Sequence, residues 1–142
     1  MKLSPSRVLS ELIAQHDTLR GMMDHCEDLA NSLDDHPDSD PTPLTRELAR
    51  LRLAFDAHNR FEEHLLRPVL LEHDAFGNVR VERMVDDHVH EHRAIRDRLA
   101  SPATSALRDV IETLRAHLDA EERYLLTSRV LRDDLVSIES AG

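Results

Sequence analysis

The chain has 142 residues, 28 of them acidic and 18 basic, so its formal net charge is −10 at pH 7. This length is typical of a single domain with one core. A surface this acidic argues against binding to nucleic acid or to an anionic membrane, because phosphate groups attract basic side chains. The only cysteine, Cys26, excludes an internal disulfide framework and a zinc site built from several thiolates.

The sequence favours a cytoplasmic protein. Its N-terminal residues run straight into an amphipathic pattern, without the apolar core of a signal peptide. No segment reaches the ~18 consecutive apolar residues that a transmembrane helix needs.

The composition favours helices. Apolar residues make up 40% of the chain, aromatic residues only 3%, and there are three glycines, so Leu, Val, Ala and Ile must form the core. Ten histidines are an unusually high number for a chain of this length, and they suggest a metal site without showing one.

The first amphipathic segment is predicted over residues 5–32. Ser4 and Pro5 form a good helix opening, a capping side chain followed by proline in the first turn. His16 lies within the apolar stripe of this helix, whereas His25 is rotated towards solvent. A polar, proline-containing loop follows.

The second segment, residues 44–73, carries His58 and Glu62 on its apolar face, with Leu65 further along. Because the pair is four residues apart, the two side chains differ by about 40° around the helix and converge. Pro68 lacks a backbone donor and clashes with the carbonyl four residues before it. We therefore expect the helix to bend or tighten there.

Two further segments, over 79–100 and 105–131, each carry one pair at the same spacing in the apolar stripe: His88 with His92, and His117 with Glu121. Tyr124, the only tyrosine, lies about 20° from His117 on the helical wheel. We expect it near the metal layer as a hydrogen-bond partner of a ligand, as a ligand, or as a core residue with a satisfied hydroxyl.

Four such segments joined by short loops predict an all-α fold, an up-down-up-down antiparallel four-helix bundle with a metal site in its core. The core faces would contribute seven ligands, namely His16, His58, Glu62, His88, His92, His117 and Glu121. Seven ligands suit two adjacent ions that the carboxylates bridge, with one position left open. Nitrogen and oxygen ligands without thiolate favour iron or manganese and allow zinc.

These motifs resemble those of the haemerythrin-like, or HHE cation-binding, domain family. The resemblance covers nearly the whole chain and rests on His16, His58-x3-Glu62 with the residues up to Pro68, His88-x3-His92, and His117-x3-Glu121-Glu122. It implies a four-helix bundle with two oxo- or hydroxo-bridged non-haem iron ions, manganese or zinc being less expected. By this resemblance the five histidines would be terminal ligands and the two glutamates would be bridges.

One position departs from the family pattern. Oxygen-carrying members have an aspartate five residues after the histidine of the last helix, and this chain has Glu122 there, directly after Glu121. Glu121 has the better geometry beside His117, so we prefer it as the ligand and keep Glu122 as the alternative.

The resemblance implies a di-iron protein that binds or reduces a small molecule, O2, NO or peroxide, in sensing, carriage or detoxification. Two alternatives stay open: a di-iron oxidase or oxygenase acting on an organic substrate, and an iron-responsive sensor or storage protein. The sequence does not decide whether the protein is an O2- or peroxide-dependent oxidoreductase, nor whether it is a homodimer.

The remaining chemistry-bearing residues have plainer interpretations. Arg20 and Arg60 neighbour ligand positions and could pair with Glu62 or Glu121, although solvated arginines are commoner. Cys26 is interpreted as a small packed hydrophobe. Five histidines lack a partner on the core face and are expected at the surface: His25, His36, His64, His73 and His90.

Overall fold

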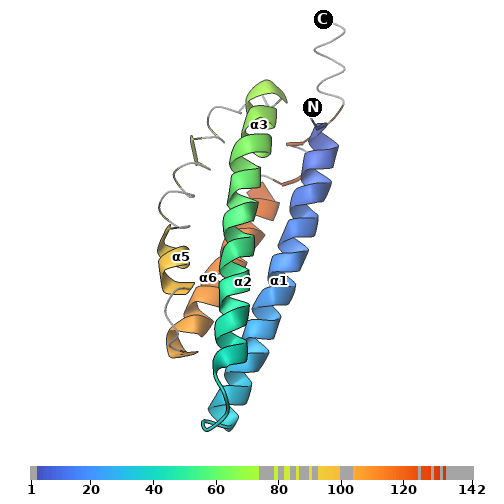
Figure 1. The fold of residues 1–142 in the computed structure, drawn as a ribbon. Coiled ribbons are helices and arrows are strands. Elements are labelled where there is room, and N and C mark those ends of the chain that lie inside the picture. Colours follow the sequence, from blue (N-terminus) through green and yellow to red (C-terminus); the bar gives the residue numbers. More distant parts are fainter. Residues whose placement is uncertain are drawn as a thin grey trace, which may run out of the picture.

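The computed structural model describes residues 3–73, 93–99, 104–124 and 126–128, together with residues 79, 82, 83, 86, 90, 130, 131 and 133. Every regular element in these ranges is helical (Figure 1). The predicted all-α class is therefore confirmed for the described part of the chain. No helix within it is long and apolar enough to cross a membrane.

The first helix, α1, spans Pro5–Asp35 and so runs slightly past its predicted end. The hydroxyl of Ser4 accepts a hydrogen bond from the backbone N–H of Arg7, which caps the first turn. The backbone N–H and the hydroxyl of Ser6 donate to the carboxylate of Asp133 at 2.9 and 2.6 Å. A carboxylate from the far end of the chain thus sits at the positive end of this helix.

The second rod is continuous but not uniform. It consists of α2 over Thr42–Phe61, a π-helical turn η1 over Glu62–Leu66, and α3 over Arg67–His73. In the π turn the backbone N–H of Arg67 donates to the carbonyl of Glu62, five residues back. Of the two outcomes expected at Pro68, tightening is wrong, because the helix widens there instead, and bending stays a prediction. A wider turn moves the preceding carbonyls away from the proline ring and lets the rod continue.

The π turn also changes which residues face the core. Leu66 and Leu70 are completely buried, whereas Leu65, predicted on the core face, is only half-buried. The extra residue in the turn moves the buried face from Leu65 to Leu66, while Val69, which the regular wheel also predicts on the core face, is buried beside Leu70.

The remaining described helices are α5, over Arg93–Leu99, and α6, over Thr104–Tyr124. His88 and His92 lie outside the described residues. The prediction that the last helix continues to residue 131 is wrong. Instead, the backbone N–H of Leu126 bonds the carbonyl of Glu121 at 2.8 Å, and the chain leaves the helix to bury apolar side chains.

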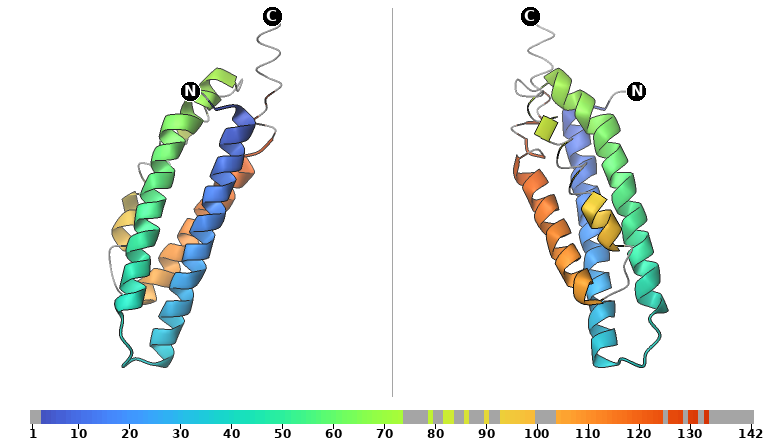
Figure 2. Two further views of the ribbon diagram at one scale, coloured as in Figure 1. Left: turned by 45° about the vertical axis from the view of Figure 1, so that its right-hand side comes forward. Right: turned by 90° about the vertical axis from the view of Figure 1, so that its left-hand side faces the viewer.

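The rods lie side by side with alternating direction (Figures 1 and 2). α1 runs antiparallel to the rod α2–η1–α3, and α6 runs antiparallel to α1. α5 packs against α2 and α6.

Two apolar clusters fill the interior. The lower cluster, towards the α1–α2 loop in Figure 1, consists of Leu19, Met23, Cys26, Ala30, Leu44, Leu48, Leu51, Phe55, Ile95, Leu107, Val110, Ile111, Leu114 and Leu118. The upper cluster, towards the chain ends, consists of Val8, Leu12, Leu66, Val69, Leu70, Leu126, Val130 and Leu131. Between them lies a layer of polar side chains.

Candidate metal centre

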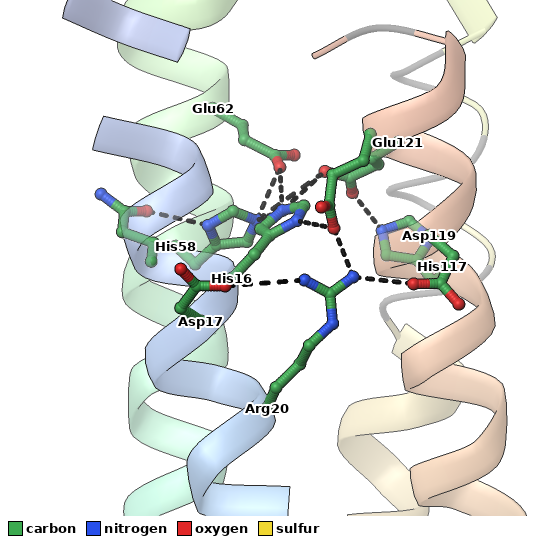
Figure 3. Close-up of polar contacts among 10 residues, drawn as sticks. His16, Asp17, Arg20, His58, Glu62, His117, Asp119 and Glu121 are labelled. Atoms are coloured by element: carbon green, nitrogen blue, oxygen red, sulfur yellow. Dashed lines mark hydrogen bonds and ion pairs between the residues drawn. The ribbon is translucent and has the colours of Figure 1, made fainter. Parts of the chain in front are cut away.

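The polar layer is built from three rods. His16 comes from α1, between Leu12 of the upper cluster and Leu19 of the lower one. His58 ends the core face of α2, Glu62 begins η1, and Glu121 comes from α6. Each of these four offers one ligand atom, and the four atoms lie within 4.8 Å of one another (Figure 3).

All four side chains are shielded from water. His16 and Glu62 are 0% exposed, His58 is 2% exposed, and Glu121 is 5% exposed. A buried group of this kind is costly unless charges are paired or a cation is bound.

The two imidazoles face the same space. Nε2 of His58 lies 2.6 Å from Oε1 of Glu62 and 3.2 Å from Nε2 of His16. Nε2 of His16 lies 3.4 Å from Oε2 of Glu121, and Nε2 of His58 lies 3.8 Å from the same oxygen. Two ring nitrogens and two carboxylates therefore converge on one point.

The opposite nitrogen of each ring is also held. Nδ1 of His58 bonds Oε1 of Gln15 at 2.8 Å, and Nδ1 of His16 bonds Oε2 of Glu122 at 3.0 Å. Because amide and carboxylate oxygens are acceptors, each Nδ1 donates its hydrogen outward. Metal-binding histidines are typically held in this way, with the inner nitrogen directed at the ion.

The electrostatics of the layer favour positive charge. Burial alone would lower the pKa of His16, but hydrogen bonds to Glu121, Glu62 and Glu122 outweigh it and raise the pKa to about 10. Burial would raise the pKa of Glu121, yet hydrogen bonds with Glu62 and neighbouring histidines hold it well below its usual range. The layer thus attracts protons, and a divalent cation would compete for the same place.

His117 lies at the outer side of this layer. It is 6% exposed, and its Nε2 pairs with Oε1 of Glu121. The structure therefore brings together five of the seven predicted ligands: His16, His58, Glu62, His117 and Glu121. Their binding of metal stays a prediction.

The two adjacent glutamates of α6 separate into different roles. Glu121 enters the layer, as expected for the preferred ligand, whereas Glu122 lies behind His16. In the contacts of the described residues, Arg20 pairs with neither Glu62 nor Glu121. Its guanidinium bonds Glu122, and it bonds Asp119 at 2.7 Å.

Two neighbours of the layer were not predicted in their observed roles. Gln15 was overlooked because helical periodicity places it beside the core stripe, and its partner His58 is on another helix. Glu122 was considered only as a ligand. A buried carboxylate elsewhere, Glu47, was also missed; Arg50 donates to it at 3.3 Å, and His25 lies 3.6 Å away.

The expectation of Tyr124 beside the metal in the core is wrong in one respect, because its side chain is 55% exposed. It lines a cavity of about 950 Å³ between α5 and α6, and this cavity also reaches His117 and Glu121. Arg83 lies over the tyrosine ring at 6.0 Å. The cavity connects the outer side of the layer with the surface.

The predictions for Cys26 and for the surface histidines agree with the structure where it describes these residues. Cys26 is fully buried in the lower cluster, as expected of a packed hydrophobe, and burial raises the pKa of its thiol to about 12. Four of the five histidines expected at the surface are exposed, namely His25, His36, His64 and His90, and the side chain of His73 lies outside the described residues.

Comparison with known proteins adds one finding. Residues 7–128 match the family model of the hemerythrin HHE cation binding domain. This stretch includes all the predicted ligands and most of the chain. Comparisons with curated proteins and with solved structures gave no significant match.

Proposed function

Since the chain belongs to the hemerythrin HHE cation-binding domain family, we propose that it is a non-haem di-iron protein that binds or reduces O2, NO or peroxide. The observation that carries this proposal is the buried convergence of two imidazole nitrogens and two carboxylates within 4.8 Å. Nitrogen and oxygen donors without thiolate suit iron, and also manganese or zinc.

The donor set fits a cation, and the described residues supply part of what two ions need. His16, His58, Glu62 and Glu121 would bind directly, with His117 beside Glu121. In this proposal His88 and His92 complete the set. Two ferrous ions would supply the electrons for reducing a small molecule.

The surrounding protein controls access to this centre. The upper and lower apolar clusters close the layer above and below, which limits water and strengthens electrostatic interactions inside. The cavity beside His117 and Glu121 offers an approach from the side.

The finer architecture belongs to the same proposal. α2–η1–α3 and α6 both run antiparallel to α1, which suits an up-down-up-down bundle in which 79–100 forms the third rod. α5 lies where the end of that rod is expected, in contact with α2 and α6. The cytoplasmic location stays a prediction.

Metal analysis with absorption spectra before and after exposure to O2 or peroxide tests the proposal. The purified protein should bind two iron ions and show near-ultraviolet absorption from iron. His58→Ala and Glu62→Ala should lose both, whereas His25→Ala, at an exposed position, should retain them. Full iron content and an unchanged spectrum in the first two variants would overturn the assignment.

The cavity favours a second candidate, a di-iron oxidase or oxygenase acting on an organic substrate. Such an enzyme needs space beside the metal, and about 950 Å³ next to His117 and Glu121 supplies it. O2 consumption that requires an organic compound would favour this candidate. Ala116→Phe, which narrows the cavity beside His117, should then lower consumption and retain iron, whereas Ala57→Phe on the exposed side of α2 should change neither.

A further inference from the structure

Glu122 links the candidate centre to a pattern of charged pairs along α1 and α6. Its Oε2 accepts a hydrogen bond from Nδ1 of His16 at 3.0 Å and also accepts one from the guanidinium of Arg20. The same guanidinium donates to Asp119 at 2.7 Å, and Asp17 lies within 3.9 Å of it (Figure 3). Glu122 is therefore restrained from both sides.

The pattern has a period of seven residues on both helices. Positions 20, 27 and 34 of α1 face positions 122, 115 and 108 of α6, and each rung pairs an arginine with an acidic residue: Arg20 with Glu122, Arg115 with Glu27, and Arg108 with Asp34. We call the first the upper rung and the second the middle rung.

The upper and middle rungs are closely matched. In each, the arginine bonds a glutamate and an aspartate, which in the middle rung is Asp24 at 2.5 Å from Arg115. The glutamate side chains are 28% exposed in the upper rung and 31% in the middle one. Within the described part of the chain, only the glutamate of the upper rung also accepts a hydrogen bond from a histidine.

Stability alone does not distinguish these rungs. Partly exposed ion pairs contribute little to folding, and the middle rung makes the same kinds of contact at a similar exposure without touching the polar layer. A carboxylate that accepts a hydrogen bond from an imidazole has a further effect. It fixes the ring orientation and the tautomer, and it makes the inner nitrogen a stronger metal ligand. Arg20 keeps that carboxylate in place beside the negative charge of Glu121.

We infer that Glu122, held by Arg20, is a positioning residue of the metal centre, which fixes the ring of His16 so that its Nε2 faces the cation. The inference rests on the proposed function, because it assumes that a cation binds the layer. It makes the two imidazoles unequal, since His16 is held by a carboxylate and His58 by the neutral amide of Gln15. It also assigns Glu122 a role other than that of a ligand.

The test compares variants of Glu122 with the same changes at Glu27 in the full-length protein. Ferrous affinity is measured anaerobically by competition with a chromogenic chelator. Glu122→Ala should weaken binding by about 10- to 100-fold without lowering the number of ions bound at saturation. Glu122→Gln should lose less affinity for ferrous ion, because an amide oxygen still accepts a hydrogen bond from Nδ1 of His16. Glu27→Ala and Glu27→Gln should bind as the unchanged protein does.

Two results would overturn the inference. One is equal affinity in Glu122→Ala and Glu27→Ala while the unchanged protein binds iron. The other is a lower number of bound ions in Glu122→Ala, as in His58→Ala, which would make Glu122 a ligand. If the unchanged protein bound no iron at all, the proposed function itself would fail.

The hydrogen bond between His16 and Glu122 can also be tested in the metal-free protein, whether or not iron binds. The proton on Nδ1 of His16 should give a downfield, slowly exchanging NMR resonance in the unchanged protein and in Glu27→Ala. Glu122→Ala should lose that resonance. Its persistence would show that Glu122 does not hold the ring.

Discussion

Two levels of the α1–α6 interface look alike from outside and differ inside. At the middle rung, Arg115 and Glu27 cover an apolar interior that includes Met23 and Cys26. At the upper rung, a matched pair covers the polar layer. The same kind of ion pair thus joins the two helices at both levels. The interior side chains next to each pair decide whether that level is part of the apolar core or of the candidate metal centre.

The comparison separates two sources of stability. The apolar clusters stabilise the fold through burial, whether or not metal is bound. The polar layer contributes fully only when its converging charges are balanced, by protons or by a cation. Variants at the two kinds of level should therefore respond differently to metal.

The largest effect is expected in the apolar interior. Phe55 is completely buried in the lower cluster, so Phe55→Ala should reduce the free energy of unfolding by about 3–5 kcal/mol. Because the cavity it leaves is not in the polar layer, the loss should be similar with and without iron. Urea denaturation in both states checks this, and Leu53→Ala at an exposed position is the control.

Metal should have the next largest effect, and it should act through the polar layer. A ligand that binds only the folded state stabilises it by about 2.7 kcal/mol at a free concentration 100 times its Kd. For a chain of this size that corresponds to a rise in Tm of roughly 5–10 °C. Calorimetry with ferrous ion should show the rise in the unchanged protein, and Glu62→Ala should abolish it.

Removing the polar character of the layer should abolish this dependence of stability on metal. His58→Leu combined with Glu62→Leu replaces a buried pair whose atoms are 2.6 Å apart. Such replacements are often neutral or stabilise by about 1–4 kcal/mol. The metal-free double variant should be at least as stable as the unchanged protein and should no longer respond to iron. Glu62→Leu alone should be destabilised, because it leaves His58 without its nearest carboxylate.

The same contrast explains how much could be predicted from the sequence. His58 with Glu62 and His117 with Glu121 were found because a pair four residues apart on one helix meets through local geometry alone. His16 was found because a histidine within a leucine stripe must be buried.

What the sequence did not reveal depends on more than one helix or on irregular geometry. The wider turn at Glu62–Leu66 accommodates Pro68, and a regular helical wheel misplaces Leu65 and Leu66 within it, although Val69 beyond it is buried as predicted. Glu122 sits beside the core stripe, and only the register between α1 and α6 brings it to His16. The period of seven in the charged residues of both helices was the available signal for that register.

The smallest changes in stability are expected from the ion pairs of the two rungs. They compare the upper and the middle rung most directly. A double-mutant cycle on Arg115 and Glu27 should show a coupling of at most about 1 kcal/mol, with or without iron, because both side chains are about one-third exposed. The cycle on Arg20 and Glu122 should match it in the metal-free protein. With ferrous ion bound, its coupling should increase by up to about 1.4 kcal/mol, the equivalent of a tenfold change in affinity. Equal couplings in both rungs with iron bound would mean that Arg20 does not act on the metal through Glu122.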